Sequence, residues 1–259
     1  MNLKVVILAG GRGTRLSEET AVKPKPMVEI GDYPILWHIM KIYTHYSYNE
    51  FIVCLGYKGY VIKEYFTNYR LHNSDFTLSL KDNEIRYENS RSENWTLTFV
   101  DTGMGTETGG RIKRIERYVE GETFMVTYGD GLSDININNL VKFHRNNKKM
   151  ATITAVMPPG RFGALKIDGN TVSKVTEKPK GDNSWINGGF FVLEPNVFDF
   201  IEGDDTIWER GPLEAIVKKR ELGAFKHKGF CHPMDTVRDR NELMNLWNSG
   251  KAPWKVWND

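Results

Sequence analysis

Apolar residues along this chain fall into short runs of strand length, separated by stretches in which they recur every three or four positions. Residues 5–9 and Phe51–Leu55 are two such runs. Apolar side chains recur at helical spacing over residues 35–46 and again over residues 61–66, which predicts two amphipathic helices. Strands that alternate with helices build a parallel sheet with helices on both faces, and ligands bind such sheets at the carboxyl ends of the strands.

The same alternation continues along the rest of the chain. Further strands are expected at residues 95–100, 124–128, 151–156 and 185–193, and further helices at residues 112–119, 134–148, 209–220 and 239–248. The turn signal Asp168-Gly169-Asn170 predicts a hairpin between residues 164–167 and 171–177. The pattern therefore predicts an α/β fold, with a single domain over residues 1–259 built on a mostly parallel, Rossmann-like sheet flanked by helices.

Residues 67–98 interrupt this alternation. They are polar, rich in Asn and Ser, and contain short alternating pieces such as Phe76–Leu80. We interpret them as a small inserted, β-rich segment rather than a linker. Two roles remain open for it, a flap on the surface and a contribution to contacts between copies of the chain. The aromatic tail, which carries Trp247, Trp254 and Trp257, also favours self-association, so we expect a homo-oligomer.

Composition and charge exclude several classes of protein. A hydrophobic content of 40% and a charged content of 26% are typical of a globular protein. A net charge of +2 gives no overall field that would attract nucleic acid or a membrane, so we expect neither as a partner. Cys54 and Cys231 stand alone, which favours packing in a reducing compartment over a disulfide. No apolar run is long enough for a signal peptide or a membrane span, so we expect a cytoplasmic protein.

The candidate chemistry begins where the first strand ends. Residues 8–16 are Leu-Ala-Gly-Gly-Arg-Gly-Thr-Arg-Leu, and Lys25 follows between two prolines. Glycines let a ligand approach the main chain, whose N–H groups can then face an anion. The pattern matches neither the Walker motif nor the GxGxxG fingerprint, and a tight turn is the structural alternative. Because prolines stiffen the backbone around Lys25, they favour a fixed ammonium group over a solvated lysine.

Three further places carry candidate polar groups. Residues 101–111 form a second glycine-rich loop, which could bind a base edge or a phosphate or simply turn the chain. Asp130 ends an apolar strand and could simply be a turn residue. Because Mg²⁺ is bound by one or two carboxylates together with phosphate oxygens, its position at a strand end favours a role as metal ligand. The amide of Asn187 could serve a sugar diol or mark a bulge. Asp235 precedes the last predicted helix, where a cap is the alternative to a metal ligand.

The segment LAGGRGTRLSEET, followed by KPKPM, resembles the opening signature of the sugar-1-phosphate nucleotidylyltransferases, and the resemblance extends over essentially the whole chain. It implies a mixed sheet of the nucleotide-diphospho-sugar transferase fold, with residues 158–259 as the sugar-phosphate-binding portion and C-terminal helix. It also implies transfer of a nucleotidyl group to a sugar phosphate. Arg15, Lys25 and Asp130 would be the catalytic residues, and Asp130 and Asp235 would hold Mg²⁺ as the cofactor.

The resemblance also implies two groups of binding residues. The nucleotide would contact Leu8, Ala9, Gly10, Gly11, Arg12, Gly13, Thr14, Arg15, Lys25, Thr106, Gly109, Gly110 and Arg111. The sugar phosphate would contact Gly131, Glu177, Lys178, Asn187 and Gly188. Residues 67–111 and 233–236 are similar to the cytidylyltransferase branch of the family. That branch implies CTP and glucose 1-phosphate as substrates, CDP-glucose for the dideoxysugars of lipopolysaccharide O antigen as product, and a homohexamer.

Nucleotidyl transfer requires in-line positioning and neutralisation of phosphate charge rather than covalent chemistry by the protein. A uridylyl- or thymidylyltransferase would share this phosphate apparatus, and a non-catalytic sugar-nucleotide-binding regulatory protein could share the fold. Cytosine differs from uracil and thymine by an amino donor in place of a carbonyl. We therefore expect backbone carbonyls, in residues 8–12 or near Gly109 and Gly110, to read the base.

Overall fold

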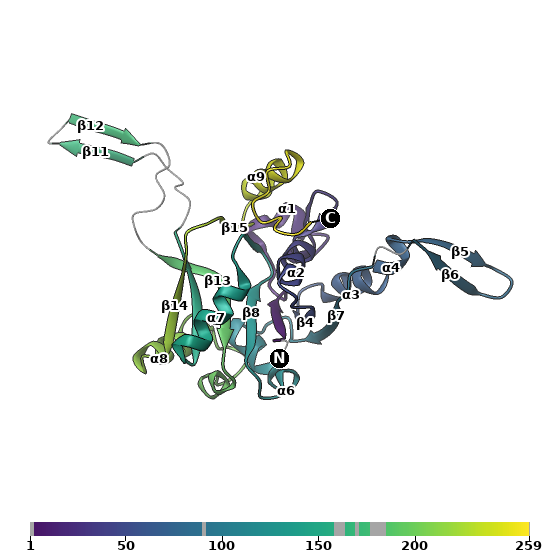
Figure 1. Ribbon diagram of the computed structural model, residues 1–259, viewed down its shortest axis with the longest axis horizontal. Helices are drawn as coiled ribbons and strands as arrows, with labels where there is room; N and C mark the ends of the chain where they lie inside the picture. The colour runs from purple at the N-terminus through teal and green to yellow at the C-terminus, as the bar shows by residue number, and fades with distance from the viewer. Residues whose placement is uncertain (1–2, 90–91, 158–163, 169–170, 177–184, 259) are drawn as a thin grey trace.

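The computed structural model describes residues 3–89, 92–157, 164–168, 171–176 and 185–258. Its centre is a seven-stranded sheet with the strand order β14-β10-β13-β8-β1-β4-β7 (Figure 1). The strands are β1 (Val5–Leu8), β4 (Glu50–Leu55), β7 (Thr96–Asp101), β8 (Phe124–Tyr128), β10 (Ala151–Val156), β13 (Ile186–Leu193) and β14 (Leu222–His227). Strand β13 runs antiparallel to β8 and β10, whereas the other neighbouring pairs are parallel. The prediction of a mostly parallel, mixed sheet is confirmed.

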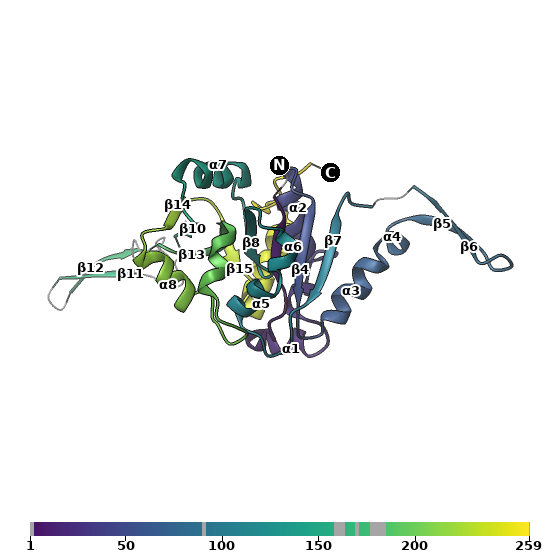
Figure 2. The same ribbon diagram turned by 90° about the horizontal axis from the view of Figure 1, so that it is seen from below.

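Helices lie against both faces of this sheet (Figure 2). The helices of the described residues are α1 (Ser17–Thr20), α2 (Ile35–His45), α3 (Gly59–Thr67), α4 (Tyr69–His72), α5 (Thr108–Arg114), α6 (Glu116–Val119), α7 (Ile137–Asn147), α8 (Gly211–Lys218) and α9 (Val237–Asn248). Three short 3₁₀ turns complete the set: η1 (Thr14–Leu16), η2 (Lys25–Met27) and η3 (Pro195–Phe200). In the part of the chain that the structure describes, no helix is long and apolar enough to cross a membrane.

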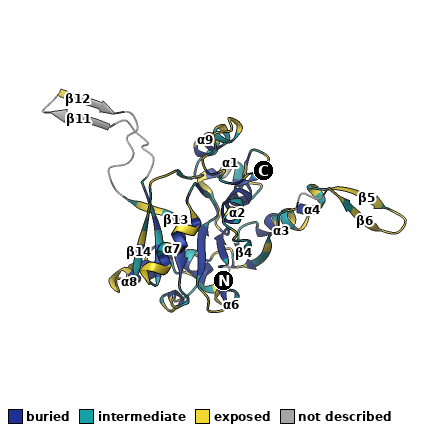
Figure 3. Ribbon diagram, viewed as in Figure 1, coloured by how far each residue is buried: buried dark blue, intermediate teal, exposed yellow. Residues whose placement is uncertain are grey.

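Alternate residues of β1 belong to two different apolar clusters, because successive side chains of a strand point to opposite faces. Val5 and Ile7 pack on the face that α2, α7 and α9 cover. Val6 and Leu8 pack on the other face, beneath α5, α6 and α8. A strand buried on both faces reads as a continuous apolar run, which is why residues 5–9 look so uniform in sequence. Figure 3 shows the buried residues concentrated at this centre.

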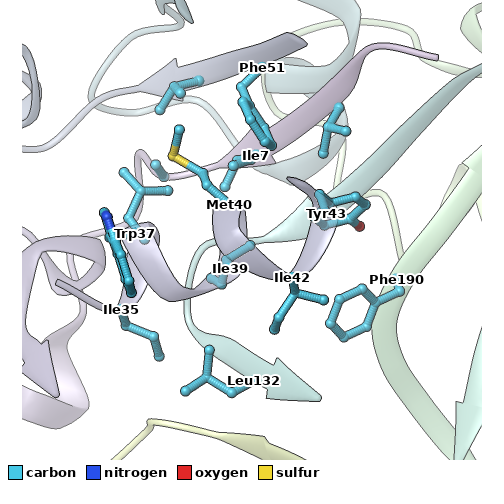
Figure 4. Packing of buried hydrophobic residues seen from close by; sticks show 14 of the residues in the cluster. Ile7, Ile35, Trp37, Ile39, Met40, Ile42, Tyr43, Phe51, Leu132 and Phe190 are labelled. Atoms are coloured by element: carbon cyan, nitrogen blue, oxygen red, sulfur yellow. The ribbon is translucent and has the colours of Figure 1, made fainter. Parts of the chain in front are cut away.

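Helix α2 supplies much of the first cluster (Figure 4). Its side chains Ile39, Met40 and Tyr43 are fully buried beside Ile7 of β1. The ring of Tyr43 lies edge-on to that of Phe51 in β4, with 6.5 Å between the ring centres. Fully burying a side chain of this kind stabilises the fold by about 1.5–3 kcal/mol. The packing of α2 therefore fixes the strands whose ends carry the glycine loop.

Residues 67–98, which were predicted to be a β-rich segment, contain a β-hairpin and also the short helix α4. Strands β5 (Asp75–Ser79) and β6 (Glu84–Glu88) pair with each other and project away from the sheet beyond α3 and α4 (Figure 1). Phe76, Leu78 and Ile85 are each more than two fifths exposed. The hairpin thus presents apolar side chains that this chain does not itself cover. The hairpin predicted between residues 164–167 and 171–177 is confirmed, since β11 (Ala164–Asp168) pairs with β12 (Thr171–Thr176).

Some elements differ from the sequence prediction. Strands β2 (Glu29–Ile30), β3 (Tyr33–Pro34), β9 (Gly131–Ser133), β14 and β15 (Cys231–Pro233) were not predicted. The helix expected over residues 134–148 begins only at Ile137, because the Asn136 side chain caps it by accepting a hydrogen bond from the N–H of Asn139. All five are short or weakly patterned; β2 pairs with the adjacent β3, whereas pairing with distant strands decides the structure of β9, β14 and β15.

The C-terminal tryptophans pack on their own chain. Trp254 is fully buried, and its indole N–H donates to His38 of α2 at 3.4 Å. Trp247 and Trp257 lie against the same histidine ring. The aromatic tail is therefore part of the core, which corrects its use as an argument for self-association.

Both cysteines are free, and Cys54 is fully buried. Burial raises the pKa of the Cys54 thiol to about 12 and that of Cys231 to about 11. Such pKa values disfavour the reactive thiolate at neutral pH, and the prediction that the two cysteines form no disulfide is confirmed.

Candidate functional site

A cavity of about 440 Å³ opens at the carboxyl ends of β1 and β8, where the fold class places ligands. Most of the nucleotide residues expected from the sequence line it: Leu8, Ala9, Gly10, Gly11, Gly13, Thr14, Arg15, Lys25, Thr106 and Arg111. Both expected metal ligands, Asp130 and Asp235, line it as well. Segments far apart in sequence thus converge on one cavity.

Gly13 is a position in the opening loop where the backbone conformation requires glycine. Its φ of +60° is a left-handed conformation that other residues rarely adopt. A Cβ atom there would also lie 3.0 Å from the Cβ of Lys25. The glycine therefore lets the loop turn directly over the lysine that enters the same cavity.

Lys25 joins the two expected metal ligands. Its Nζ donates to Oδ2 of Asp130 at 2.6 Å and to Oδ1 of Asp235 at 2.8 Å. Arg15 pairs with the other oxygen of Asp235 at 3.0 Å. Burial opposes the charge on Lys25, but the attraction of Asp130 and Asp235 outweighs it and raises the pKa of the ammonium above its ordinary value. The cavity wall thus carries two carboxylates that already converge on one cation.

A small antiparallel pair brings these carboxylates together. Strand β9 begins just after Asp130, β15 ends just before Met234, and Gly131 pairs with Pro233 in this short ladder. The N–H of Met234 donates to the carbonyl of Asp130 at 2.8 Å, which fixes Asp235 beside Asp130. Because neither strand was predicted, the sequence alone left this juxtaposition to the family resemblance.

Asp235 does not cap the helix that follows it. Thr236 is the N-cap of α9, and Thr236 and Asp239 form a reciprocal capping box. The alternative interpretation of Asp235 as a helix cap is therefore wrong. Its carboxylate is directed instead to Lys25 and Arg15.

Arg111 is buried beneath the opening loop. Its guanidinium donates to the carbonyls of Leu55 at 3.2 Å, Gly103 at 2.8 Å and Gly10 at 3.1 Å. It also donates to Thr102 Oγ1 at 2.7 Å. Burial lowers the pKa of this guanidinium, although an arginine stays charged in a protein. Arg111 therefore ties together the ends of three strands in addition to lining the cavity.

The contacts of Arg111 restrict how a base could be read. The carbonyl of Gly10 accepts from Arg111 and also from the N–H of Tyr57 at 3.1 Å. A carbonyl oxygen has two lone pairs, so the Gly10 carbonyl has no remaining capacity for a cytosine amino group. Among residues 8–12, another carbonyl would have to serve as the acceptor.

Three expected nucleotide residues lie elsewhere. Gly109 and Gly110 are in α5, where an added Cβ would come within 2.6 Å of the Thr206 carbonyl and 2.5 Å of the Asp204 carbonyl. These glycines allow close packing of α5 on that loop and do not line the cavity. Arg12 is exposed and likewise lies outside the cavity lining.

A second, smaller cavity of about 100 Å³ adjoins the first. It is lined by three of the expected sugar-phosphate residues: Gly131, Asn187 and Gly188. The amide of Asn187 is oriented by its neighbours, since Oδ1 accepts from the N–H of Gly189 at 2.8 Å and Nδ2 donates to the Tyr128 hydroxyl at 3.2 Å. Glu177 and Lys178, the other expected sugar-phosphate residues, lie outside the described part of the chain.

Tyr128 lines both cavities, and sequence reasoning missed it. Sequence reasoning also missed Glu107 and Thr108, which line the first cavity, and Glu209, which accepts a hydrogen bond from the Tyr128 hydroxyl. A signal for Tyr128 exists in its place at the end of β8, two residues before Asp130. Glu209 has none, because its neighbours in space are far away in sequence.

The donor set suits a hard divalent cation that also binds phosphate. Among the described residues, no group of three or more His, Cys, Asp or Glu side chains could hold a metal by itself. Asp130 and Asp235 form a pair, and Mg²⁺ is bound by one or two carboxylates with phosphate oxygens and waters completing its shell. That both carboxylates meet one ammonium group indicates that they can share one cation.

Comparisons with known proteins agree with this geometry. Residues 4–229 match the family model described as nucleotidyl transferase. The chain is 57% identical over 256 residues to a protein of Salmonella typhi named glucose-1-phosphate cytidylyltransferase, covering 98% of this chain and 100% of the relative. It is 44% identical, with the same coverage, to a Bacillus subtilis protein named probable glucose-1-phosphate cytidylyltransferase.

A solved structure supports the fold. The chain resembles a putative glucose-1-phosphate thymidylyltransferase from Bacillus anthracis with a TM-score of 0.69 and 19% identity, over 99% of this chain and 98% of the other. At that identity the likeness concerns the fold alone. The family model and the curated relatives place the chain more narrowly: it belongs to the nucleotidyl transferase family and, within it, to the glucose-1-phosphate cytidylyltransferases.

Proposed function

We propose that this chain transfers the cytidylyl group of CTP to α-D-glucose 1-phosphate, which gives CDP-glucose and releases pyrophosphate. The observation that carries the proposal is the cluster of Arg15, Lys25, Asp130 and Asp235 in the wall of the glycine-loop cavity. The names of the relatives supply the base and the sugar.

The reaction we propose is a direct in-line displacement. A phosphate oxygen of glucose 1-phosphate attacks the α-phosphorus of CTP, and the bond from that phosphorus to the pyrophosphate oxygen breaks. The attacking oxygen is already anionic near neutral pH, so no general base is required. Lys25 and Arg15 neutralise the charge of the departing pyrophosphate, a role in which one preorganised group contributes about 10²–10³ in rate.

Asp130 and Asp235 are the residues that we propose hold Mg²⁺. When bound, the ion neutralises phosphate charge and holds the triphosphate in a fixed geometry. Lys25 now pairs with one oxygen of each carboxylate, and we propose that it exchanges at least one of these contacts for phosphate oxygens when the ion and the nucleotide bind. The freed ammonium group then lies within reach of phosphate oxygens in the same cavity.

The smaller cavity is the proposed sugar site. Asn187 directs one amide hydrogen to Tyr128, which leaves its second amide hydrogen for a sugar hydroxyl. Gly188 has no side chain, and an added Cβ would come within 2.7 Å of Val156, which lines the same cavity. Glu177 and Lys178 are proposed, from the family resemblance, to contact a sugar hydroxyl and the sugar phosphate.

The base is the part of the proposal that needs the most direct test. Pyrophosphate release should be measured with CTP, UTP, dTTP and ATP, each with glucose 1-phosphate and Mg²⁺. Release with CTP alone supports the proposal. Release only with UTP or dTTP would agree with the proposed mechanism but contradict cytosine as the base. If folded protein releases no pyrophosphate with any of the four nucleotides, a regulatory sugar-nucleotide-binding protein is favoured.

We also propose a cytoplasmic homo-oligomer with a single domain per chain, and a hexamer on the family resemblance. The exposed apolar side chains of the β5–β6 hairpin support self-association, since the chain itself does not cover them. Native mass spectrometry distinguishes a hexamer from smaller assemblies. Replacing Leu78 and Ile85 with serine should lower the oligomeric state if the hairpin forms the contact.

A further inference from the structure

One carboxylate touches groups that belong to both cavities. Oε2 of Glu209 accepts from Thr108 Oγ1 at 2.8 Å, and Oε1 accepts from the Tyr128 hydroxyl. Thr108 lines the larger cavity at the start of α5, whereas Tyr128 lines both. Tyr128 in turn accepts from Asn187 Nδ2 at 3.2 Å in the smaller cavity. A continuous chain of hydrogen bonds therefore runs from the proposed nucleotide site to the proposed sugar site.

The backbone of β13 is shaped to receive Tyr128. Gly189 has a φ of +80°, and a Cβ atom there would come within 2.7 Å of the Tyr128 ring. The same residue donates its N–H to Asn187 Oδ1. The ring also lies edge-on to Phe191, with 5.9 Å between the ring centres. Packing thus fixes the ring while Glu209 fixes its hydroxyl.

Glu209 itself is held by a buried neighbour. Trp208 is fully buried and lies edge-on to Phe191 at 6.2 Å. The N–H of Trp208 donates to Thr108 Oγ1 at 2.9 Å, so Thr108 is bound both by the backbone before Glu209 and by the Glu209 side chain. Burial and the adjacent Glu209 carboxylate raise the pKa of the Tyr128 phenol, which keeps it a hydrogen-bond donor at neutral pH.

We infer that Glu209 is a positioning residue that couples the two cavities: it holds Tyr128, and through it Asn187, in place for the sugar phosphate, and nucleotide bound against Thr108 restrains this arrangement further. The inference rests on the proposed function, in which the two cavities hold the two substrates. Glu209 acts through Thr108 and Tyr128, which it holds, and takes no part in bond formation. Two of the three links are hydrogen bonds to the charged Glu209 carboxylate, which are stronger than bonds between neutral groups, and the third joins Asn187 to the Tyr128 hydroxyl.

Glu209→Gln is the first variant to test. A glutamine has a single carboxamide oxygen, so it can accept from Thr108 or from Tyr128 but not from both in the present arrangement. We expect the KM for glucose 1-phosphate to rise about tenfold, the size of one hydrogen bond to a charged group, with a smaller change in kcat. Glu202→Gln is the matched control, because Glu202 is an exposed residue of the same loop.

Binding measurements separate coupling from a purely structural effect. Calorimetry should measure glucose 1-phosphate affinity with and without CTP whose α,β-bridging oxygen is replaced by methylene. The unmodified protein and Glu202→Gln should bind the sugar phosphate more tightly when the analogue is present. In Glu209→Gln and in Tyr128→Phe this tightening should fall about tenfold.

The inference is overturned if Glu209→Gln keeps the tightening of the unmodified protein, or if the unmodified protein shows none. It is also overturned if Tyr128→Phe keeps the tightening that Glu209→Gln loses. Turnover of CTP by the unmodified protein tests the proposed function separately, so the failure of one conclusion is distinguishable from the failure of the other.

Discussion

Replacing Lys25 with methionine tests the charge cluster most sharply. The substitution keeps the length and apolar stem of the side chain but removes the ammonium group that bridges Asp130 and Asp235. The two carboxylates then face each other without that cation, and Asp235 keeps its contact with Arg15. The variant should fold, lose activity, and gain stability from Mg²⁺.

The magnitudes follow from how far each group is exposed. The Lys25 side chain is 10% exposed, whereas Asp130 is 31% and Asp235 17% exposed, so water and Arg15 partly compensate the carboxylates. Removing one partner of such a pair costs about 2 kcal/mol of unfolding free energy, below the 3–5 kcal/mol of a fully buried pair. Typical domains have an unfolding free energy of about 5–15 kcal/mol, so the fold should survive this loss. The rate should nevertheless fall by about 10²–10³.

Two assays report these effects separately. Urea unfolding measures stability with and without Mg²⁺, and pyrophosphate release measures turnover. Mg²⁺ should stabilise Lys25→Met more than the unmodified protein, because the ion takes the place of the lost ammonium. Lys23→Met is the control, since Lys23 pairs with the exposed Glu29 outside the cavity and should cost less than about 1 kcal/mol. Near-native turnover by folded Lys25→Met would refute the assigned role, and equal Mg²⁺ stabilisation would refute the shared-cation reasoning.

Two further predictions concern buried polar groups. Arg111→Lys keeps the charge, but the N–H groups of an ammonium radiate from a single nitrogen and cannot reproduce the fork by which the guanidinium reaches three separate carbonyls. The unfolding free energy should therefore fall by about 1–3 kcal/mol, and the KM for CTP should rise. An unchanged KM would show that Arg111 does not contribute to nucleotide binding. Burial lowers the pKa of His38 to about 4, against about 6.5 in an unfolded chain, so only the unfolded chain takes up this proton between those pH values. The free energy of unfolding should therefore fall by about 3 kcal/mol as pH falls from about 6.5 to about 4. In urea unfolding, His38→Gln should show a weaker dependence of this free energy on pH. An equally steep dependence in the variant would contradict the role given to His38.

The sequence predicts the sheet well because its strands are buried on both faces. Residues 5–9 and Phe51–Leu55 read as continuous apolar runs, and the glycines that follow the first run mark its ligand-binding end. Strand β14 is different, since Gly223 and several exposed positions break its pattern. Only its pairing with β10 makes it a strand, and pairing between distant segments is not visible in local sequence.

The site shows the same division between local and distant information. Lys25 is visible in sequence because two prolines surround it, and Asp130 is visible because it ends a strand. Their contact depends on η2 and on the short β9–β15 ladder, which local patterns do not predict. The sequence also could not show that the Arg111 guanidinium binds backbone carbonyls, because its burial depends on three separate strand ends.

The central claim is that this cavity joins a cytidylyl group to glucose 1-phosphate. The most direct measurement follows the reaction of CTP, glucose 1-phosphate and Mg²⁺ by phosphorus NMR with the unmodified protein. The account predicts CDP-glucose and pyrophosphate in equal amounts, and no product when either substrate is omitted or a chelator is added. Pyrophosphate without glucose 1-phosphate, or free phosphate in place of CDP-glucose, would contradict it, because either result would mean hydrolysis instead of transfer.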